Sequence, residues 1–222
     1  MQIKIHNEGW VYLVVSILIA IIFIPFSYSI GILFFILSIF IFYFFRNPDR
    51  AIPVEDVIIS PADGKITFIG ETDSPLKINS KLKFYKISIF LSIFNVHVNR
   101  IPCNGLIKKI KYFHGKFINA SLNKSSENNE RNIILIEKEN KDIILVTQIA
   151  GLIARRIVCE VNENQEVQKG HRFGIIKFGS RVDIYIPINY KPLVTIGQNV
   201  IGGETIIANP NNIQHITNSQ KI

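Results

Sequence analysis

The stretch from Trp10 to Phe45 contains no charged residue, and no other feature of the sequence constrains the fold so strongly. As one helix it would extend about 54 Å at 1.5 Å per residue, nearly twice the roughly 30 Å of a membrane's hydrocarbon core. Its middle, from Pro25 to Gly31, combines a helix breaker with small polar residues. We therefore expect two short helices, at about 11–25 and 30–45, joined by a tight turn.

Charges on both flanks predict how this hairpin sits in a membrane. Lys4 precedes it, and Arg46 and Arg50 follow it. The positive-inside rule places both flanks in the cytoplasm. Residues 1–45 would then be an α-helical membrane anchor, and residues 46–222 a domain on the cytoplasmic face of the cell (inner) membrane. One tilted span is an alternative, whereas a cleaved signal peptide is disfavoured because no small-residue cleavage site follows the long apolar stretch.

The composition narrows the choice of partners and cofactors. A net charge of +8 would suit nucleic-acid binding, but the chain has no compact basic run with interleaved aromatic residues. A membrane segment on the same chain favours anionic lipids as the partner instead. The two cysteines, Cys103 and Cys159, are too few for a disulfide framework and have few soft ligands near them, which predicts reduced thiols and no metal site.

The chain after Phe45 carries short apolar runs that are rich in Ile, Val, Phe and Tyr and are separated by Gly, Pro and Asn. The clearest runs are 57–59, 65–69, 84–94, 133–137 and 142–146. Turn signals recur about every ten residues, a spacing typical of an all-β sandwich or barrel. Because no sustained helical period occurs in this part, we predict a mainly β domain behind the helical hairpin.

Two segments near the end of the chain resemble each other. Residues 163–175 (ENQEVQKGHRFGI) and 195–207 (TIGQNVIGGETII) both place Gln-x-Val-x-x-Gly before a short apolar run. The pattern resembles the half-barrel of lipoyl-carrier domains, in which the glycine serves a tight turn between strands. No lysine suitable for modification sits at a turn tip, so the repeat indicates shared architecture and not a carrier function.

Three other segments contain residue types that carry chemistry. Asp63 lies in a turn, His97 in a β-rich run, and Ser180 follows Gly179. Each is ordinary alone, as an Asx turn, a buried histidine and a Gly-Ser turn. Together they supply the Asp, His and Ser that activate a weak hydroxyl nucleophile. No Gly-x-Ser-x-Gly elbow is present, which disfavours a hydrolase and leaves another use for the serine.

Five segments, taken in order, resemble the phosphatidylserine decarboxylase family in its short form with an amino-terminal hydrophobic region. They are FRNP (45–48), PADG (61–64), NVHVNR (95–100), GLIARRIVC (151–159) and RFGIIKFGS (172–180), and the resemblance extends from Phe45 to about Ala208. Longer family members carry a second histidine where this chain has Arg100, and Leu-Gly-Ser-Thr where it has Phe-Gly-Ser-Arg. His97 is therefore the histidine left for that segment.

The resemblance implies a proenzyme that makes phosphatidylethanolamine from phosphatidylserine. The chain would cut itself between Gly179 and Ser180 into a large chain, 1–179, and a small chain, 180–222, which stay together as a heterodimer. Ser180 would become a pyruvoyl group that forms a Schiff base with the substrate amine and acts as the electron sink, without a metal. Glycine at 179 leaves the attacked carbonyl open.

The same resemblance assigns roles to the other residues. His97 would be the general base of the self-cleavage and later the proton donor, with Asp63 holding its tautomer. Four arginines would attract anionic headgroups: Arg46, Arg50, Arg155 and Arg156.

Three alternatives stay open at this point. The late repeat suits a non-enzymatic, membrane-anchored barrel or adaptor module, which would remain one chain of 25.3 kDa. A decarboxylase of another serine phospholipid would keep the same residues. A Ser-His-Asp hydrolase is the least favoured, because the nucleophile elbow is missing.

Overall fold

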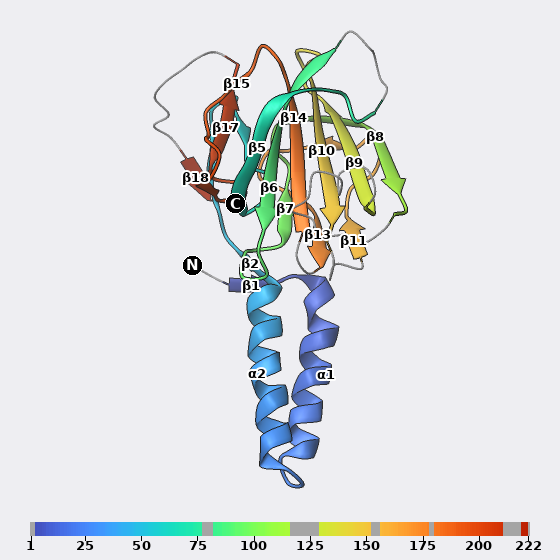
Figure 1. Ribbon diagram of the computed structural model, residues 1–222, viewed down its shortest axis with the longest axis vertical. Coiled ribbons are helices and arrows are strands. Elements are labelled where there is room, and N and C mark those ends of the chain that lie inside the picture. The colour runs from blue at the N-terminus through green and yellow to red at the C-terminus, as the bar shows by residue number, and fades with distance from the viewer. Residues whose placement is uncertain are drawn as a thin grey trace. The chain divides into compact units, whose positions relative to one another are not determined.

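The structure is a computed structural model that describes residues 3–76, 82–115, 129–151, 156–177, 180–210 and 219–221. The chain divides into two compact units, Met1–Asp49 and Arg50–Ile222. Figure 1 shows the first as a pair of helices and the second as a set of strands.

The first unit is a helical hairpin. Helix α1 (Asn7–Phe23) packs along α2 (Tyr28–Phe44), and the short strands β1 (Ile3–Ile5) and β2 (Arg46–Pro48) pair antiparallel at its base. Helix α1 begins before the expected position because the His6 ring accepts a hydrogen bond from the Glu8 amide, 3.3 Å away, and caps the helix. It ends before Pro25, which has no N–H to continue the helical ladder.

Small residues let the two helices approach closely. The buried positions include Gly9, Ser16 and Ala20 on α1, and Gly31 and Ser38 on α2. The Ser38 hydroxyl donates to Ser16 Oγ at 2.8 Å, so the polar groups of this interface satisfy each other. Large apolar side chains cover the outside of the hairpin and are exposed. None of the helices among the described residues is both long and apolar enough to cross a membrane.

The second unit is built on one antiparallel sheet of eight strands, ordered β12-β8-β9-β10-β14-β6-β5-β16 (Figure 1). Its strands are β5 (Gly64–Asp73), β6 (Lys83–Leu91), β8 (Gly105–Phe113), β9 (Arg131–Glu137), β10 (Ile143–Ala150), β12 (Glu166–Val167), β14 (Ser180–Pro187) and β16 (Asn199–Val200). The sheet curls into a half-barrel, so the predicted mainly β class is confirmed for this unit.

Three smaller antiparallel sheets complete the unit. One orders β11 (Arg156–Cys159), β13 (Arg172–Lys177) and β7 (Val98–Arg100); a second orders β15 (Lys191–Pro192), β17 (Ile206–Asn209) and β4 (Ile58–Ile59); and a third pairs β18 (Ser219–Lys221) with β3 (Ala51–Pro53). After Asp49, the described residues contain no helix.

Successive side chains along each long strand point to opposite faces of the large sheet. On β14, Val182, Ile184 and Ile186 point into the main core, where they meet Ile176 and Phe173 of β13. Tyr185 belongs instead to a second apolar cluster on the opposite face. Because neighbours on a strand point to opposite faces, Ser180 shares the main-core face and Arg181 and Asp183 share the other.

The weak sequence repeat corresponds to two matching turns at the two edges of the large sheet. Gln165 Oε1 accepts from the Asn162 amide at 2.9 Å, and Gln198 Oε1 accepts from the Thr195 amide at 3.0 Å. In each copy the following valine, Val167 or Val200, is buried in the main core. The repeat therefore reflects shared architecture.

In both copies of the repeat, the last residue of the shared pattern is a glycine with a left-handed backbone. Gly170 has φ +84° and Gly203 has φ +89°. A Cβ on either residue would lie within 3.0 Å of the Ile52 side chain. The two turns therefore converge on the same buried side chain, and glycine fits there for both conformational and steric reasons.

Candidate active site

Ser180 lies at one end of the central strand of the large sheet. It is the first residue of β14, and it pairs with Ala150 at the end of β10 and with Leu91 at the end of β6. Its side chain is fully buried, and its hydroxyl makes no hydrogen bond to any described residue. Gly179, the other half of the predicted cleavage site, lies outside the described residues. The structure thus gives the position of the predicted nucleophile and not the geometry of the bond it would attack.

His97 reaches the same region from the three-stranded sheet. It directly precedes β7, and the Ile176 amide of β13 donates to its carbonyl oxygen at 3.4 Å. Strand β13 ends at Lys177, only two residues before Gly179. The pairing of β7 with β13 therefore holds His97 close in the fold to the segment that joins β13 to Ser180.

A backbone carbonyl sets the tautomer of His97. The ring is fully buried, and its Nδ1 lies 3.0 Å from the carbonyl oxygen of Asn95. A carbonyl oxygen can only accept, so Nδ1 carries the hydrogen in the neutral ring and Nε2 is the basic nitrogen. The Asn95 carbonyl thus orients the ring, and the orienting role that the sequence analysis gave to Asp63 stays a prediction.

Asp63 forms a partly buried ion pair. Arg50 Nη2 donates to both of its oxygens, at 2.9 and 2.8 Å, and the Gly202 amide donates to Oδ1 at 2.8 Å. Such charge-assisted hydrogen bonds stabilise the ionised carboxylate. The expectation that Arg50 attracts lipid headgroups is wrong, because its side chain is buried and committed to Asp63. A direct bond between Asp63 and His97 stays a prediction.

The topology gathers the predicted residues at one end of the large sheet. Strand β5 begins directly after Asp63, and β14 begins at Ser180. Strands β6 and β10 run antiparallel to them and end there, and the loop after β6 leads to His97. Residues that are far apart in the sequence therefore lie at the same end of the sheet's strands, as a catalytic site on a β scaffold requires.

A chain of buried amides lies beside this end and was missed by the sequence analysis. Asn132 Nδ2 donates to Gln148 Oε1 at 3.0 Å, and Gln148 Nε2 donates to Asn99 Oδ1 at 2.9 Å. Gln148 pairs with Val182, two residues after Ser180, and Asn99 follows His97 by two residues. The network ties the sheet that carries Ser180 to the sheet that carries His97. Polar residues at core-facing strand positions were the signal that could have identified it.

The remaining arginines have different surroundings. The Arg46 guanidinium lies 3.7 Å from the centre of the Tyr43 ring, inside the hairpin unit. Arg156 is exposed on β11 and pairs with Lys177, the last residue of β13. Arg155 lies outside the described residues. A role in headgroup binding stays a prediction for all three.

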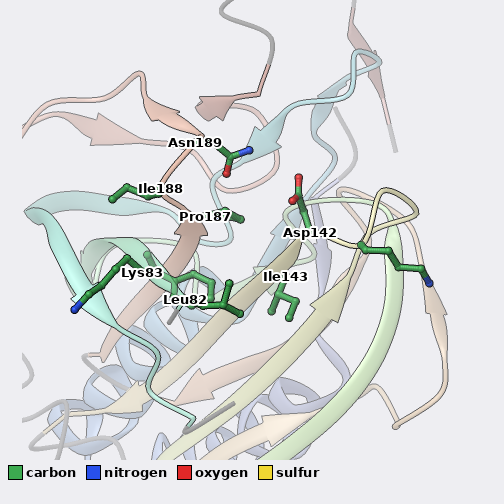
Figure 2. A pocket seen from close by; sticks show the side chains of 9 residues that line it. Leu82, Lys83, Asp142, Ile143, Pro187, Ile188 and Asn189 are labelled. Atoms are coloured by element: carbon green, nitrogen blue, oxygen red, sulfur yellow. The ribbon is translucent and has the colours of Figure 1, made fainter. Parts of the chain in front are cut away.

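A pocket of about 360 Å³ lies at the opposite end of the same strands (Figure 2). Its wall includes Phe84, Ile143 and Pro187, which stand at the other ends of β6, β10 and β14. Seven residue steps along β14 separate Pro187 from Ser180, or about 24 Å at 3.4 Å per step. This pocket is therefore distinct from the candidate active site. The described residues contain no group of three histidine, cysteine or acidic side chains that could hold a metal ion.

Comparison with known proteins gives the site its context. The family model described as phosphatidylserine decarboxylase matches residues 37–208. The chain belongs to the phosphatidylserine decarboxylase family. Among curated relatives, it is 50% identical to a protein of Rickettsia typhi over 206 residues, which cover 92% of this chain and 89% of the relative. It is 53% identical to a protein of Ehrlichia chaffeensis over 208 residues, with 92% and 91% covered.

A third relative, from Pelagibacter ubique, is 48% identical over 207 residues that cover 92% of this chain and 96% of that protein. All three relatives are named phosphatidylserine decarboxylase proenzyme. The decarboxylase family match spans Asp63, His97 and Ser180 together, and it ends at Ala208, where the resemblance of the motifs also ends.

Proposed function

We propose that this chain is a self-cleaving proenzyme that converts phosphatidylserine to phosphatidylethanolamine in phospholipid biosynthesis. The observation that carries the proposal is the membership of the phosphatidylserine decarboxylase family over residues 37–208, which include Gly179-Ser180. The buried hydroxyl of Ser180, at the same sheet end as His97 and Asp63, supports it.

The self-cleavage follows from the chemistry of a serine next to a glycine. Ser180 Oγ attacks the Gly179 carbonyl carbon, and an ester replaces the amide; His97 Nε2 takes the hydroxyl proton and returns it to the departing Ser180 nitrogen. Loss of the Ser180 Cα proton then expels Gly179 as a carboxylate from Cβ and leaves dehydroalanine. Water replaces the nitrogen of that residue, which releases ammonia and leaves a pyruvoyl group on residue 180.

The surroundings of Ser180 fit such a group. Its side chain lies on the main-core face between Leu91 and Ala150, where an uncharged ketone with a methyl group can be buried at a much lower cost than an ionised group. When present, the group supplies a carbonyl that accepts the electrons released as carbon dioxide leaves the substrate. His97 would hold at Nε2 the proton that replaces the lost carboxylate. The Asp63 carboxylate, fixed by Arg50, would stabilise the charged form of that ring.

The first test is the mass of the purified native chain together with a lipid assay. In proportion to residue number, the 25.3 kDa should appear as about 20 kDa for residues 1–179 and about 5 kDa for 180–222. The small chain should resist Edman degradation, because a pyruvoyl group has no amine. An intact single chain with full activity would contradict the self-cleavage. Two chains that decarboxylate only another serine phospholipid would support that alternative instead.

We also propose that the hairpin anchors the protein in the inner membrane, with the second unit on the cytoplasmic side. The outer side chains of the hairpin are large, apolar and exposed, among them Ile22 and Leu33. Each helix of 17 residues extends about 26 Å, less than the roughly 30 Å of the hydrocarbon core. A hairpin of this length would enter from one side and return to it, which keeps Lys4 and Arg46 at the same surface.

Flotation with phosphatidylcholine–phosphatidylglycerol vesicles tests this anchoring on the full chain. The native protein should stay bound in 1 M salt, because salt screens charges and not apolar contacts. A double substitution, Ile22→Lys with Leu33→Lys, should reduce the bound fraction at least about tenfold, since each lysine costs about 2.5–3.5 kcal/mol deep in a membrane. Val11→Lys, near the base of the hairpin, is the matched control and should have little effect. Complete release of the native chain by salt would contradict the anchor.

A further inference from the structure

The proposed cut would place strand β14 in a different chain from the two strands that flank it. It begins at Ser180, so it would become the first strand of the small chain. It lies between β6 and β10, which both belong to the large chain. Its register would then depend on non-covalent contacts alone at the end that carries the reactive group. This inference rests on the proposed function and asks what holds residue 180 in place afterwards.

A buried cluster of charges lies on β14 just after Ser180. Arg181 and Asp183 have side chains only 3% and 0% exposed, and they form a two-point ion pair: Nε lies 2.8 Å from Oδ1, and Nη2 donates to Oδ2 at 2.9 Å. Lys86 Nζ of β6 lies 3.3 Å from Asp183 Oδ2, and its side chain is 17% exposed. Arg181 and Asp183 belong to the future small chain, whereas Lys86 belongs to the large chain.

The buried Asp183 carboxylate lies near the Tyr185 phenol and the cations of Arg181 and Lys86. Burial raises the pKa of the nearby Tyr185 phenol, and the Asp183 carboxylate raises it further. Both effects disfavour the phenolate, the second because two negative charges would be close together. A carboxylate buried this completely is stable only when cations compensate it. Arg181 supplies a cation from the same strand, and Lys86 supplies a further one from the large chain.

The cluster also fixes the register of β14. Asp183 stands between Ser88 of β6 and Thr147 of β10, on the face opposite the main core. A slip of one residue would move Arg181 and Asp183 to the face occupied by Val182 and Ile184, which belongs to the main apolar core. Leaving charges in that core is strongly unfavourable, so the ion cluster excludes the slipped register.

We propose that the Lys86–Asp183 ion pair, braced by Arg181, is a lock between the large and small chains that keeps β14 in register after self-cleavage. It holds residue 180 opposite Leu91 and Ala150, and thereby at the sheet end that carries His97 and Asp63. In this proposal Lys86, Arg181 and Asp183 are positioning residues. Before the cut, the covalent link to Gly179 also helps to keep β14 in register. After the cut, the ion cluster keeps that end of the strand in register without it.

The test measures how fast the small chain leaves the large one. Native protein and Lys86→Met are incubated in urea below the unfolding transition, and the two chains are separated by gel filtration over time. We expect Lys86→Met to release the small chain at least about tenfold faster. Of Lys86 and Arg181, only Lys86 belongs to the large chain, so the substitution removes the ion pair that joins the two chains at Asp183. Lys86→Arg keeps the charge and should restore slow release.

Two controls make the result specific. Lys83→Met removes an exposed ion pair with Asp73, whose side chains are 56% and 75% exposed and lie entirely within the large chain. It should leave the release rate unchanged. Lys86→Met combined with Ser180→Ala should elute as one folded chain, which shows that the substitution permits folding.

The outcomes separate this proposal from the proposed function. If the native chain is not cut, the proposed function is wrong, and the lock between the large and small chains is wrong as well. If the native chain is cut but Lys86→Met retains its small chain as long as the native protein does, the lock alone is wrong. Faster release from Lys86→Arg, equal to that from Lys86→Met, would also overturn it, because the charge would then not be the cause.

Discussion

The Ser180→Ala variant is expected to remain a single chain of 25.3 kDa and to show no decarboxylation above background. The methyl group has no oxygen to attack the Gly179 carbonyl, so neither the cut nor the pyruvoyl group can form. Loss of a nucleophile of this kind lowers the rate by at least about 10⁴-fold. Gel electrophoresis measures the cut, and release of carbon dioxide from labelled phosphatidylserine measures the reaction.

Ser88→Ala is the matched control for this variant. Ser88 is also a buried serine of the large sheet, but it lies on β6 and on the opposite face. It should be cut and active like the native chain. Cleavage of Ser180→Ala at the native position would show that another group opens the chain.

Asp63→Asn gives an intermediate case. An amide cannot form the ion pair with Arg50, and it stabilises a charged His97 less well than a carboxylate does. The cut should therefore occur, but slowly, in a time course read by electrophoresis. Maturation at the native rate would mean that Asp63 holds Arg50 and takes no part in the chemistry.

The second large effect concerns His97, whose two proposed roles can be separated. His97→Ala should fail to mature, so its inactivity alone says nothing about decarboxylation. The mature state is instead supplied by combining a separately prepared pyruvoyl small chain, 180–222, with a large chain that carries His97→Ala. This complex should still form a covalent adduct with the substrate amine that borohydride traps. It should release product at least about 10²-fold more slowly than the native complex, the usual loss when a positioned general acid is removed.

His171→Ala in the large chain is the control for the reassembly. His171 is exposed, and its carbonyl receives a backbone hydrogen bond from Ile101 that the substitution leaves intact. A complex with this change should turn over like the native complex. If the His97→Ala complex also turns over at the native rate, His97 serves in maturation only, and another group protonates the substrate carbon.

Much of the strand content could be predicted, because the long strands alternate apolar and polar residues between clear turn signals. The run 133–137, for example, lies within β9, and 142–146 overlaps the first half of β10. The partners of the candidate catalytic groups could not be predicted. The acceptor at His97 Nδ1 is a backbone carbonyl, which no sequence pattern marks. Arg50 seemed a surface cation because it follows an apolar segment, yet the fold brings it against Asp63.

The ends of the hairpin were predicted within a few residues, and the errors have local causes. The expected start of the first helix ignored His6, whose ring caps the helix from outside the apolar stretch. Strand β1 pairs with β2, which follows the hairpin. This pairing depends on the two helices bringing distant residues together, and the strand propensity of the short segments does not reveal it.

The matching turns at the two edges of the large sheet have a consequence for how copies of this protein meet. The outermost strands, β12 and β16, contain only two residues each. Each covers only one end of the long strand beside it, Gly105–Leu106 of β8 and Gly64–Lys65 of β5. A strand from another molecule that docks on β12 or β16 itself would find a template of about two residues, too short to form a lasting ladder. By ending each of these strands in a tight glycine turn, the repeated Gln-x-Val-x-x-Gly segment therefore guards these two stretches of the sheet against strand addition from another copy.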